Sequence, residues 1–317
     1  MRYLITGGSG FVGRVLTSHL LASGCEVRLS LRQPPSADQI VDVEKVEIGS
    51  LSLKNDWTAA LRNVDRIVHL AARVHVMNDS SSDPLAEFRR VNVDGTANLA
   101  LQAAAAGVSR FVYLSSIKVN GEFTQEGHPF TADDDPSPED PYGVSKHEAE
   151  QTLRQIAVDT GMEVVIIRPP LVYGPGVKAN FASMMRWLAR GVPLPLAAAT
   201  QNRRSLVALD NLVDLIIACL SHPAAANQTF LISDGEDLST AGLLRRMGAA
   251  LGHPARLFHV PPPMLKLGAQ VVNKLGMYQR LYCSLQLDIT KTRRLLGWTP
   301  PVSVDEGLRR VAEGFRA

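Results

Sequence analysis

Short runs of apolar residues alternate along the first half of the chain with stretches in which apolar positions recur every three or four residues. The apolar runs predict strands at residues 3–6, 26–31, 45–48, 66–70, 110–115 and 163–168. Helical patterns lie between most of them, notably at residues 12–22, 86–106 and 142–160. Repeated alternation of apolar strands with helices predicts an α/β fold built on a doubly wound parallel sheet.

Beyond residue 168 prolines become frequent and the regular alternation ends. We expect helices at residues 181–190 and 210–220, strands at 205–208 and 229–232, and further helical segments at 243–251, 261–277, 290–296 and from 304 onward. This change of pattern indicates that the last part of the chain is organised differently from the first.

Composition and charge narrow the possible function classes. The chain has 317 residues, of which 45% are hydrophobic and 20% are charged, and its net charge is +2. This balance predicts no dominant attraction to nucleic acid or to membrane surfaces, and no apolar run is long enough for membrane insertion. Cys25, Cys219 and Cys283 show neither metal-binding nor disulfide spacing. With no signal-peptide pattern after Met1, we expect a cytoplasmic protein without a metal site.

A glycine-rich turn joins the first predicted strand to the first predicted helix. Its glycines are spaced Gly-x-x-Gly-x-x-Gly. Glycines in such a turn can tighten it, admit a pyrophosphate to the backbone and bring the helix close to the sheet, with the helix N-terminus facing the phosphates. We therefore expect a dinucleotide site in a Rossmann-type unit, formed by Gly7, Gly10, Phe11, Val12 and Gly13.

The end of the second predicted strand bears on which dinucleotide is used. An acidic residue there would bind the ribose 2′-hydroxyl, whereas an arginine would suit a 2′-phosphate. No acid is present at this strand end, and Arg32 follows it. The pattern favours NADP(H), with NAD(H) possible.

Tyr142 and Lys146 form the most informative pair for chemistry. Asp140 is a favoured N-cap and Pro141 a favoured first helical residue, so both side chains should lie on one face at the start of a helix. At 4 Å and an effective dielectric near 20, a lysine ammonium would favour a phenolate by about 4 kcal/mol, or about three pKa units. Tyr142 is therefore a candidate general acid or base.

Together these features resemble an extended short-chain dehydrogenase/reductase of the NAD(P)-dependent epimerase/dehydratase group. Besides the glycine turn and the Tyr142–Lys146 pair, the specific marks are the motifs at residues 70–72, 113–116, 168–175 and 204–207. The resemblance covers nearly the whole chain and implies a catalytic set of Ser116, Tyr142 and Lys146. Ser116, not Ser115, aligns with the family serine.

Ser50 replaces the usual aspartate at the adenine-contacting position. The resemblance implies further cofactor contacts at Ser50, Leu51, Leu70, Ala71, Ala72, Asn92 and Pro169.

The resemblance also implies a nucleotide sugar, here a UDP-sugar, as substrate. Asn180 and Arg204 match positions that contact the diphosphate or the adjacent sugar, and Arg280 is a second candidate diphosphate ligand. Guanidinium groups suit this role because they bind phosphate in a bidentate manner. Leu171 stands where epimerases of the family often carry an amide.

Other side chains near the predicted site fall into two groups. Ser116 and Lys118 are expected to contact the sugar, with His75 and Asn120 flanking it. His69 and His75 are more easily read as structural than as catalytic residues.

Three functions compete. Several phrases resemble bacterial enzymes that reduce a UDP-4-keto-6-deoxy-N-acetylhexosamine at C4 during surface polysaccharide (O-antigen) synthesis, and this reductase is the leading hypothesis. The alternative is a UDP-hexose or UDP-N-acetylhexosamine 4-epimerase with tightly bound NAD. The third is a non-catalytic NAD(P)-sensing regulator. A 4,6-dehydratase is disfavoured because no acid stands beside Ser116.

The resemblance further implies how the chain is divided. Residues 1–170 would form the NAD(P)-binding Rossmann domain, with residues 205–233 returning to it. Residues 171–317 would form a smaller, interleaved C-terminal substrate domain. Family members commonly pair as homodimers through helices that correspond to residues 86–106 and 142–160, so we expect a homodimer.

Overall fold

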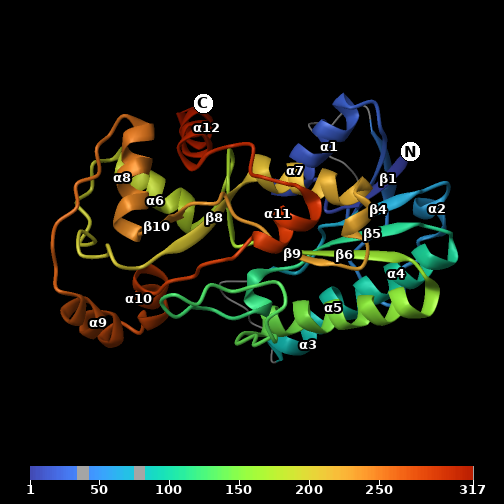
Figure 1. Cartoon of the computed structure of the whole chain (residues 1–317), viewed down its shortest axis with the longest axis horizontal. Helices are drawn as coiled ribbons and strands as arrows, with labels where there is room; N and C mark the ends of the chain where they lie inside the picture. The colour runs from blue at the N-terminus through green and yellow to red at the C-terminus, as the bar shows by residue number, and fades with distance from the viewer. Residues whose placement is uncertain (34–42, 75–82, 317) are drawn as a thin grey trace.

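A seven-stranded sheet forms the larger part of the protein, at the right of Figure 1. The computed structural model describes residues 1–33, 43–74 and 83–316. The strand order is β3-β2-β1-β4-β5-β6-β9, and all neighbours run parallel. The strands are β1 (Arg2–Thr6), β2 (Glu26–Leu31), β3 (Glu44–Glu47), β4 (Arg66–His69), β5 (Arg110–Leu114), β6 (Glu163–Arg168) and β9 (Thr229–Leu231). The order reverses between β1 and β4, and sheets of this kind bind ligands beyond the carboxyl ends of the strands at such a point.

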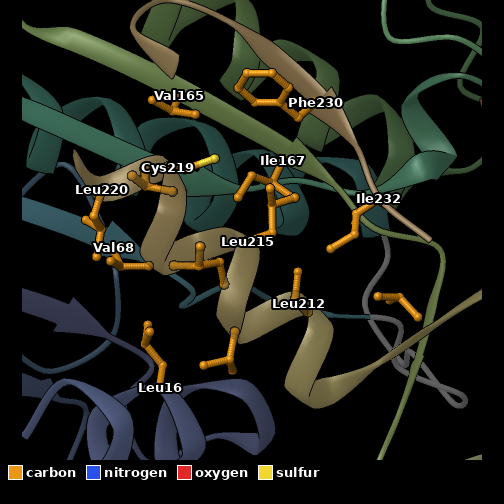
Figure 2. Close-up of a cluster of buried hydrophobic side chains, with 14 of the residues drawn as sticks. Leu16, Val68, Val165, Ile167, Leu212, Leu215, Cys219, Leu220, Phe230 and Ile232 are labelled. Carbon is orange, nitrogen blue, oxygen red and sulfur yellow. The ribbon is translucent and has the colours of Figure 1, made fainter. Parts of the chain in front are cut away.

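Helices cover both faces of this sheet because alternate strand residues point to opposite sides. On one side α1 (Phe11–Ala22) and α7 (Leu209–Ser221) pack on a core that includes Ile5 and Val68. Figure 2 shows Leu212, Leu215 and Cys219 of α7 among side chains of β4, β6 and β9. On the other side lie α2 (Thr58–Leu61), α4 (Gly95–Ala105) and α5 (Pro141–Thr160). Both faces of the central strands are therefore buried, as in other parallel sheets with helices on both sides.

A smaller unit lies at the left of Figure 1. Its sheet has the order β10-β8-β7, with β7 (Leu171–Tyr173) parallel and β10 (Asp237–Leu238) antiparallel to β8 (Arg204–Ala208). The core of this unit is shared by α6 (Ala179–Ala189), α8 (Thr240–Leu251) and α12 (Val304–Arg316). The helices α9 (Pro262–Val271) and α10 (Leu275–Tyr282) lie at its lower edge, and α11 (Thr290–Leu296) lies against β9.

The chain passes between the two units more than once. After β7 and β8 in the small sheet, α7 and β9 belong to the large one, and β10 lies again in the small sheet. The domain division at residue 170, with residues 205–233 returning, remains a prediction. Within that returning span the structure places β8 in the small sheet.

The predicted fold class is confirmed, and most predicted strands agree with the observed ones to within one residue. The helical pattern at 86–106 is confirmed as a continuous helical stretch, in which a π-helical turn η1 (Arg90–Asp94) separates α3 (Pro84–Arg89) from α4. The proline-led segment 261–277 contains α9 and the start of α10. A π-turn widens the backbone spiral and is often associated with functional sites.

Candidate active site

The glycine turn between β1 and α1 is built for close backbone approach. Gly7 has a φ of +69°, and a Cβ there would lie 2.9 Å from the backbone nitrogen of Ala71. A Cβ on Gly13 would overlap the carbonyl oxygen of Gly7. The N-cap of α1 is Gly10, and no side chain in the described residues caps this helix. Its first-turn N–H groups can therefore bind an anion, and the turn fits the pyrophosphate of a dinucleotide such as NAD.

The loop that follows β4 is fixed by polar side chains from three elements. The backbone N–H of Ala71 donates to the Thr6 hydroxyl at 3.1 Å. Asn92, in the π-turn, accepts from the Arg73 N–H at 2.8 Å and donates to the Arg73 carbonyl and to the Ser145 hydroxyl, each at 3.0 Å. These contacts use both amide hydrogens, so Asn92 holds the loop in place beside the cofactor site. Leu70, Ala71 and Ala72 in this loop are half-buried.

The remaining cofactor candidates border the same end of the sheet. Arg32 and Ser50 are exposed, and Leu51 is buried. Leu51 lies under α4, where a Cβ on Gly95 would be 2.7 Å from its own Cβ. Pro169 is buried after β6, and its carbonyl accepts from the Ile117 N–H at 3.0 Å.

His69, at the end of β4, lies beneath this region. Its ring nitrogens contact the Thr6 hydroxyl at 2.7 Å and the Thr96 hydroxyl at 2.9 Å. Complete burial lowers the pKa of His69 to about 3, and the charge of Lys146 adds to this effect. The ring is therefore neutral and ties β1 to α4, which is a structural role.

The catalytic candidates Tyr142 and Lys146 lie in the first two turns of α5. The helix starts as its sequence suggests: Asp140 Oδ1 accepts from the Gly143 N–H at 2.7 Å, and Pro141 is the first helical residue. Lys146 Nζ donates to the Leu114 carbonyl at 2.9 Å, which fixes it at the end of β5. The same nitrogen lies 5.9 Å from the centre of the Tyr142 ring.

The two adjacent serines point to different partners. The Ser115 hydroxyl donates to Glu150 Oε1 at 2.5 Å, in the interior. The Ser116 side chain lies beside Tyr142 and lowers the pKa of the phenol, and its oxygen accepts from the Lys118 N–H at 3.3 Å. The structure thus brings Ser116, Tyr142 and Lys146 together and directs Ser115 away from them.

Burial dominates the electrostatics of this site. It raises the pKa of Tyr142 to about 12, with a further contribution from the negative charge of Asp140. It also lowers the pKa of Lys146 to about 7, against the opposing effect of Glu150. The pKa of Tyr142 is therefore raised in the protein alone, contrary to the expected lowering, and desolvation disfavours the charged form of the nearby Lys146.

The substrate candidates differ in how free they are to bind. Lys118 is not free, because Nζ pairs with Glu122 at 2.6 Å and with Asp140 at 2.5 Å. Burial opposes the charged form of Lys118, but these two carboxylates raise its pKa. These ion pairs hold Lys118 against the start of α5, and its contact with the sugar remains a prediction. Asn120 is likewise engaged, with Arg168 and with the Thr131 carbonyl.

Two arginines lie together at the small-unit side of the site. Arg204 in β8 donates from Nη1 to the Cys283 carbonyl at 3.1 Å. Burial lowers the pKa of Arg204, and the nearby positive charge of Arg280 lowers it further. Arg280 is exposed on α10, and Asn180 is exposed at the start of α6. Two neighbouring guanidinium groups suit a diphosphate. His75 lies outside the described residues.

A buried ion pair behind the catalytic helix was not foreseen from the sequence. Arg168 donates to Glu150 from Nε at 2.9 Å and from Nη2 at 2.5 Å, and the two side chains are 3% and 1% exposed. Glu150 follows Lys146 by one helical turn. This spacing put Glu150 on the same helix face as Lys146 and could have indicated a buried position, but a glutamate in a helix with many polar residues usually faces water.

Across the described residues, no group of three or more histidine, cysteine or acidic side chains could hold a metal ion.

The parallel sheet, the glycine turn and the Ser116–Tyr142–Lys146 set define a dinucleotide-dependent enzyme of the short-chain dehydrogenase/reductase type. The chain belongs to the NAD dependent epimerase/dehydratase family, whose sequence profile matches residues 3–233. The predicted family and the predicted NAD-dependent enzyme class are therefore confirmed. Among the described residues, no helix is both long and apolar enough to cross a membrane.

Known proteins resemble this chain over nearly its whole length. The UDP-glucose 4-epimerase of Vibrio cholerae is 48% identical over 313 residues, which are 98% of this chain and 94% of that protein. The structure of MoeE5 in complex with UDP-glucuronic acid and NAD has a TM-score of 0.78 at 26% identity, covering 100% of this chain and 99% of the other. The UDP-glucose 4-epimerase of Thermotoga maritima with UDP-glucose has a TM-score of 0.79 at 23% identity, with the same coverage, and supports the fold.

Proposed function

We propose that this protein is an NAD-dependent UDP-hexose or UDP-N-acetylhexosamine 4-epimerase. The observation that carries the proposal is the 48% identity to a UDP-glucose 4-epimerase across both chains. This favours the epimerase alternative over the leading sequence-based hypothesis of a 4-ketoreductase. The NAD in the MoeE5 structure, at 26% identity, supports NAD as the cofactor.

The residues of this chain would divide the work of such a reaction. Bound NAD supplies hydride transfer at C4 of the sugar. Tyr142, which lies beside Ser116, would take the proton from the C4 hydroxyl as the sugar is oxidised and would return it to the C4 oxygen when C4 is reduced from its opposite face. Lys146, held by the Leu114 carbonyl, fixes the nicotinamide ribose. Arg204 and Arg280 hold the diphosphate and allow the sugar to turn over while the UDP remains bound.

A direct test is to incubate the purified protein with UDP-glucose, and separately with UDP-N-acetylglucosamine, without added cofactor. We expect NMR to show conversion to the C4 epimer, and denaturation to release stoichiometric NAD. Tyr142→Phe should retain NAD and lose turnover by several orders of magnitude. An active Tyr142→Phe variant would refute the catalytic assignment.

The 4-ketoreductase of surface polysaccharide synthesis is the second candidate function. The observation that favours it is the exposed Arg32 after β2, at a strand end without an acid. A reductase would consume NADPH stoichiometrically with UDP-4-keto-6-deoxy-N-acetylglucosamine and would not epimerise either UDP-hexose. The two assays on one preparation therefore separate the candidates.

A further inference from the structure

Helix α9 presents apolar side chains to solvent at the outer edge of the small unit, at the lower left of Figure 1. Met264, Leu267 and Val271 are 64%, 63% and 79% exposed. Their spacing of three and four residues puts them on one face of the helix. Val272, directly after α9, and Met277 in α10 are 63% and 55% exposed and extend the apolar surface. We call these five residues the α9 surface.

The opposite side of α9 is also apolar. Pro262, Leu265 and Ala269 are half-buried and face the rest of the protein. No residue of α9 or α10 is fully buried. Single apolar side chains are common on protein surfaces, but contiguous groups of them are not. The outer side of a helix that is apolar on both sides is therefore normally covered by another surface.

The charge around the α9 surface has one sign. Between Asp237 and Asp288 the sequence contains no aspartate or glutamate, although the whole chain has 31 of them. Lys266 lies on α9, Lys274 directly precedes α10, and Arg280 lies on α10. None of these three forms an ion pair with a described carboxylate in the structure. The net charge of +2 for the chain conceals this local excess because it averages over all residues.

Apolar side chains next to unpaired basic ones suit an anionic lipid surface better than a second copy of this chain. A second copy of this chain would bring its own basic residues against the same basic residues, which is unfavourable. An anionic lipid surface offers an apolar interior to the α9 surface and negative headgroups to the lysines and arginines.

We propose that α9 and α10 dock this protein on an anionic membrane surface. Met264, Leu267 and Val271 enter the headgroup region, and Lys266 and Lys274 lie against the headgroups. Such docking needs no membrane-spanning helix. The proposal does not rest on the catalytic function.

The test is flotation of the full-length protein with two kinds of vesicle, phosphatidylcholine alone and phosphatidylcholine mixed with phosphatidylglycerol. We expect binding to the anionic vesicles that weakens as salt is added, and little binding to the neutral ones. Leu267→Glu should reduce partitioning about tenfold or more, since it places a charge in the apolar contact. Leu53→Glu is a matched control, because Leu53 is a leucine with 64% exposure far from α9 in the sequence.

Several results would overturn the proposal. These are absence of binding to anionic vesicles, equal binding to both vesicle types, or equal losses for Leu267→Glu and Leu53→Glu. Val271→Glu, at a side chain with 79% exposure, serves as a second variant if Leu267→Glu does not fold. Light scattering without vesicles tests whether the α9 surface instead joins two copies of the chain. If Leu267→Glu dissociates an oligomer of the wild-type protein, the surface joins two copies of the chain and the proposal is wrong.

Discussion

Replacement of Glu150 by glutamine tests how the catalytic helix is anchored. Glu150 and Arg168 are 1% and 3% exposed and share two hydrogen bonds, and the Ser115 hydroxyl donates to the same carboxylate. Glutamine keeps the shape but removes the charge, so the guanidinium remains buried without its counter-ion. Breaking a buried pair in this way costs about 3–5 kcal/mol. We expect a loss of that size in the free energy of unfolding, measured by urea denaturation.

The same helix provides the control. Glu148 pairs with Arg89, but those side chains are 27% and 49% exposed, so water screens the pair and Glu148→Gln should change stability little. Replacing both buried partners, as in Glu150→Leu with Arg168→Met, should recover much of the loss because no uncompensated charge remains. If Glu150→Gln were no more destabilising than Glu148→Gln, the anchoring role of this pair would be refuted.

Three further predictions concern the site and the assembly. The pKa of Lys146 is about 7 in the folded protein against 10.5 for the free side chain, so the unfolded chain holds more protons between these values. Wild-type stability should therefore rise relative to Lys146→Met from pH 7 to pH 10, and parallel pH profiles from urea denaturation would contradict the shift. Arg280→Gln should raise KM for a UDP-hexose about tenfold with little change in kcat, whereas Arg245→Gln, at an exposed site on α8, should leave both unchanged; equal effects would remove Arg280 from the diphosphate site. The predicted homodimer should appear by light scattering at twice the 34.4 kDa of the chain. Leu101→Glu with Val158→Glu, at side chains 54% and 81% exposed on α4 and α5, should yield monomers, and an unchanged dimer would place the interface elsewhere.

The large sheet was predictable because its strands are buried on both faces. Residues 163–168 contain a run of four apolar residues and residues 26–31 alternate apolar with polar ones, and the observed β6 and β2 have the predicted bounds. β7 and β10 were not expected, since strands of three and two residues are too short to show a period. The π-turn within residues 86–106 was also missed. The apolar pattern continues through it, and the reason for the break is tertiary: Asn92 bonds to the Arg73 backbone and to Ser145.

The site was predictable where neighbours in sequence determine it. Asp140, Pro141, Tyr142 and Lys146 belong to one helix start, and local capping places them. Lys118 forms an ion pair with Asp140, which lies 22 residues further along the chain, and no local pattern in the sequence reveals that pair. The expected low pKa of Tyr142 failed for a similar reason. The sequence suggested the attraction between two charges, but not the burial that opposes it.

The path of the chain between its two units has a consequence for protein engineering and for evolution. A fragment that ended at residue 170 would lack α7 and β9. Its β6 strand would become an open edge, and Val68, Val165 and Ile167, which α7 and β9 now cover (Figure 2), would face water. Open edges and bare apolar faces lead to aggregation. The cofactor half is therefore not a transferable module, and recombination can exchange this substrate unit only together with the segment that completes the larger sheet.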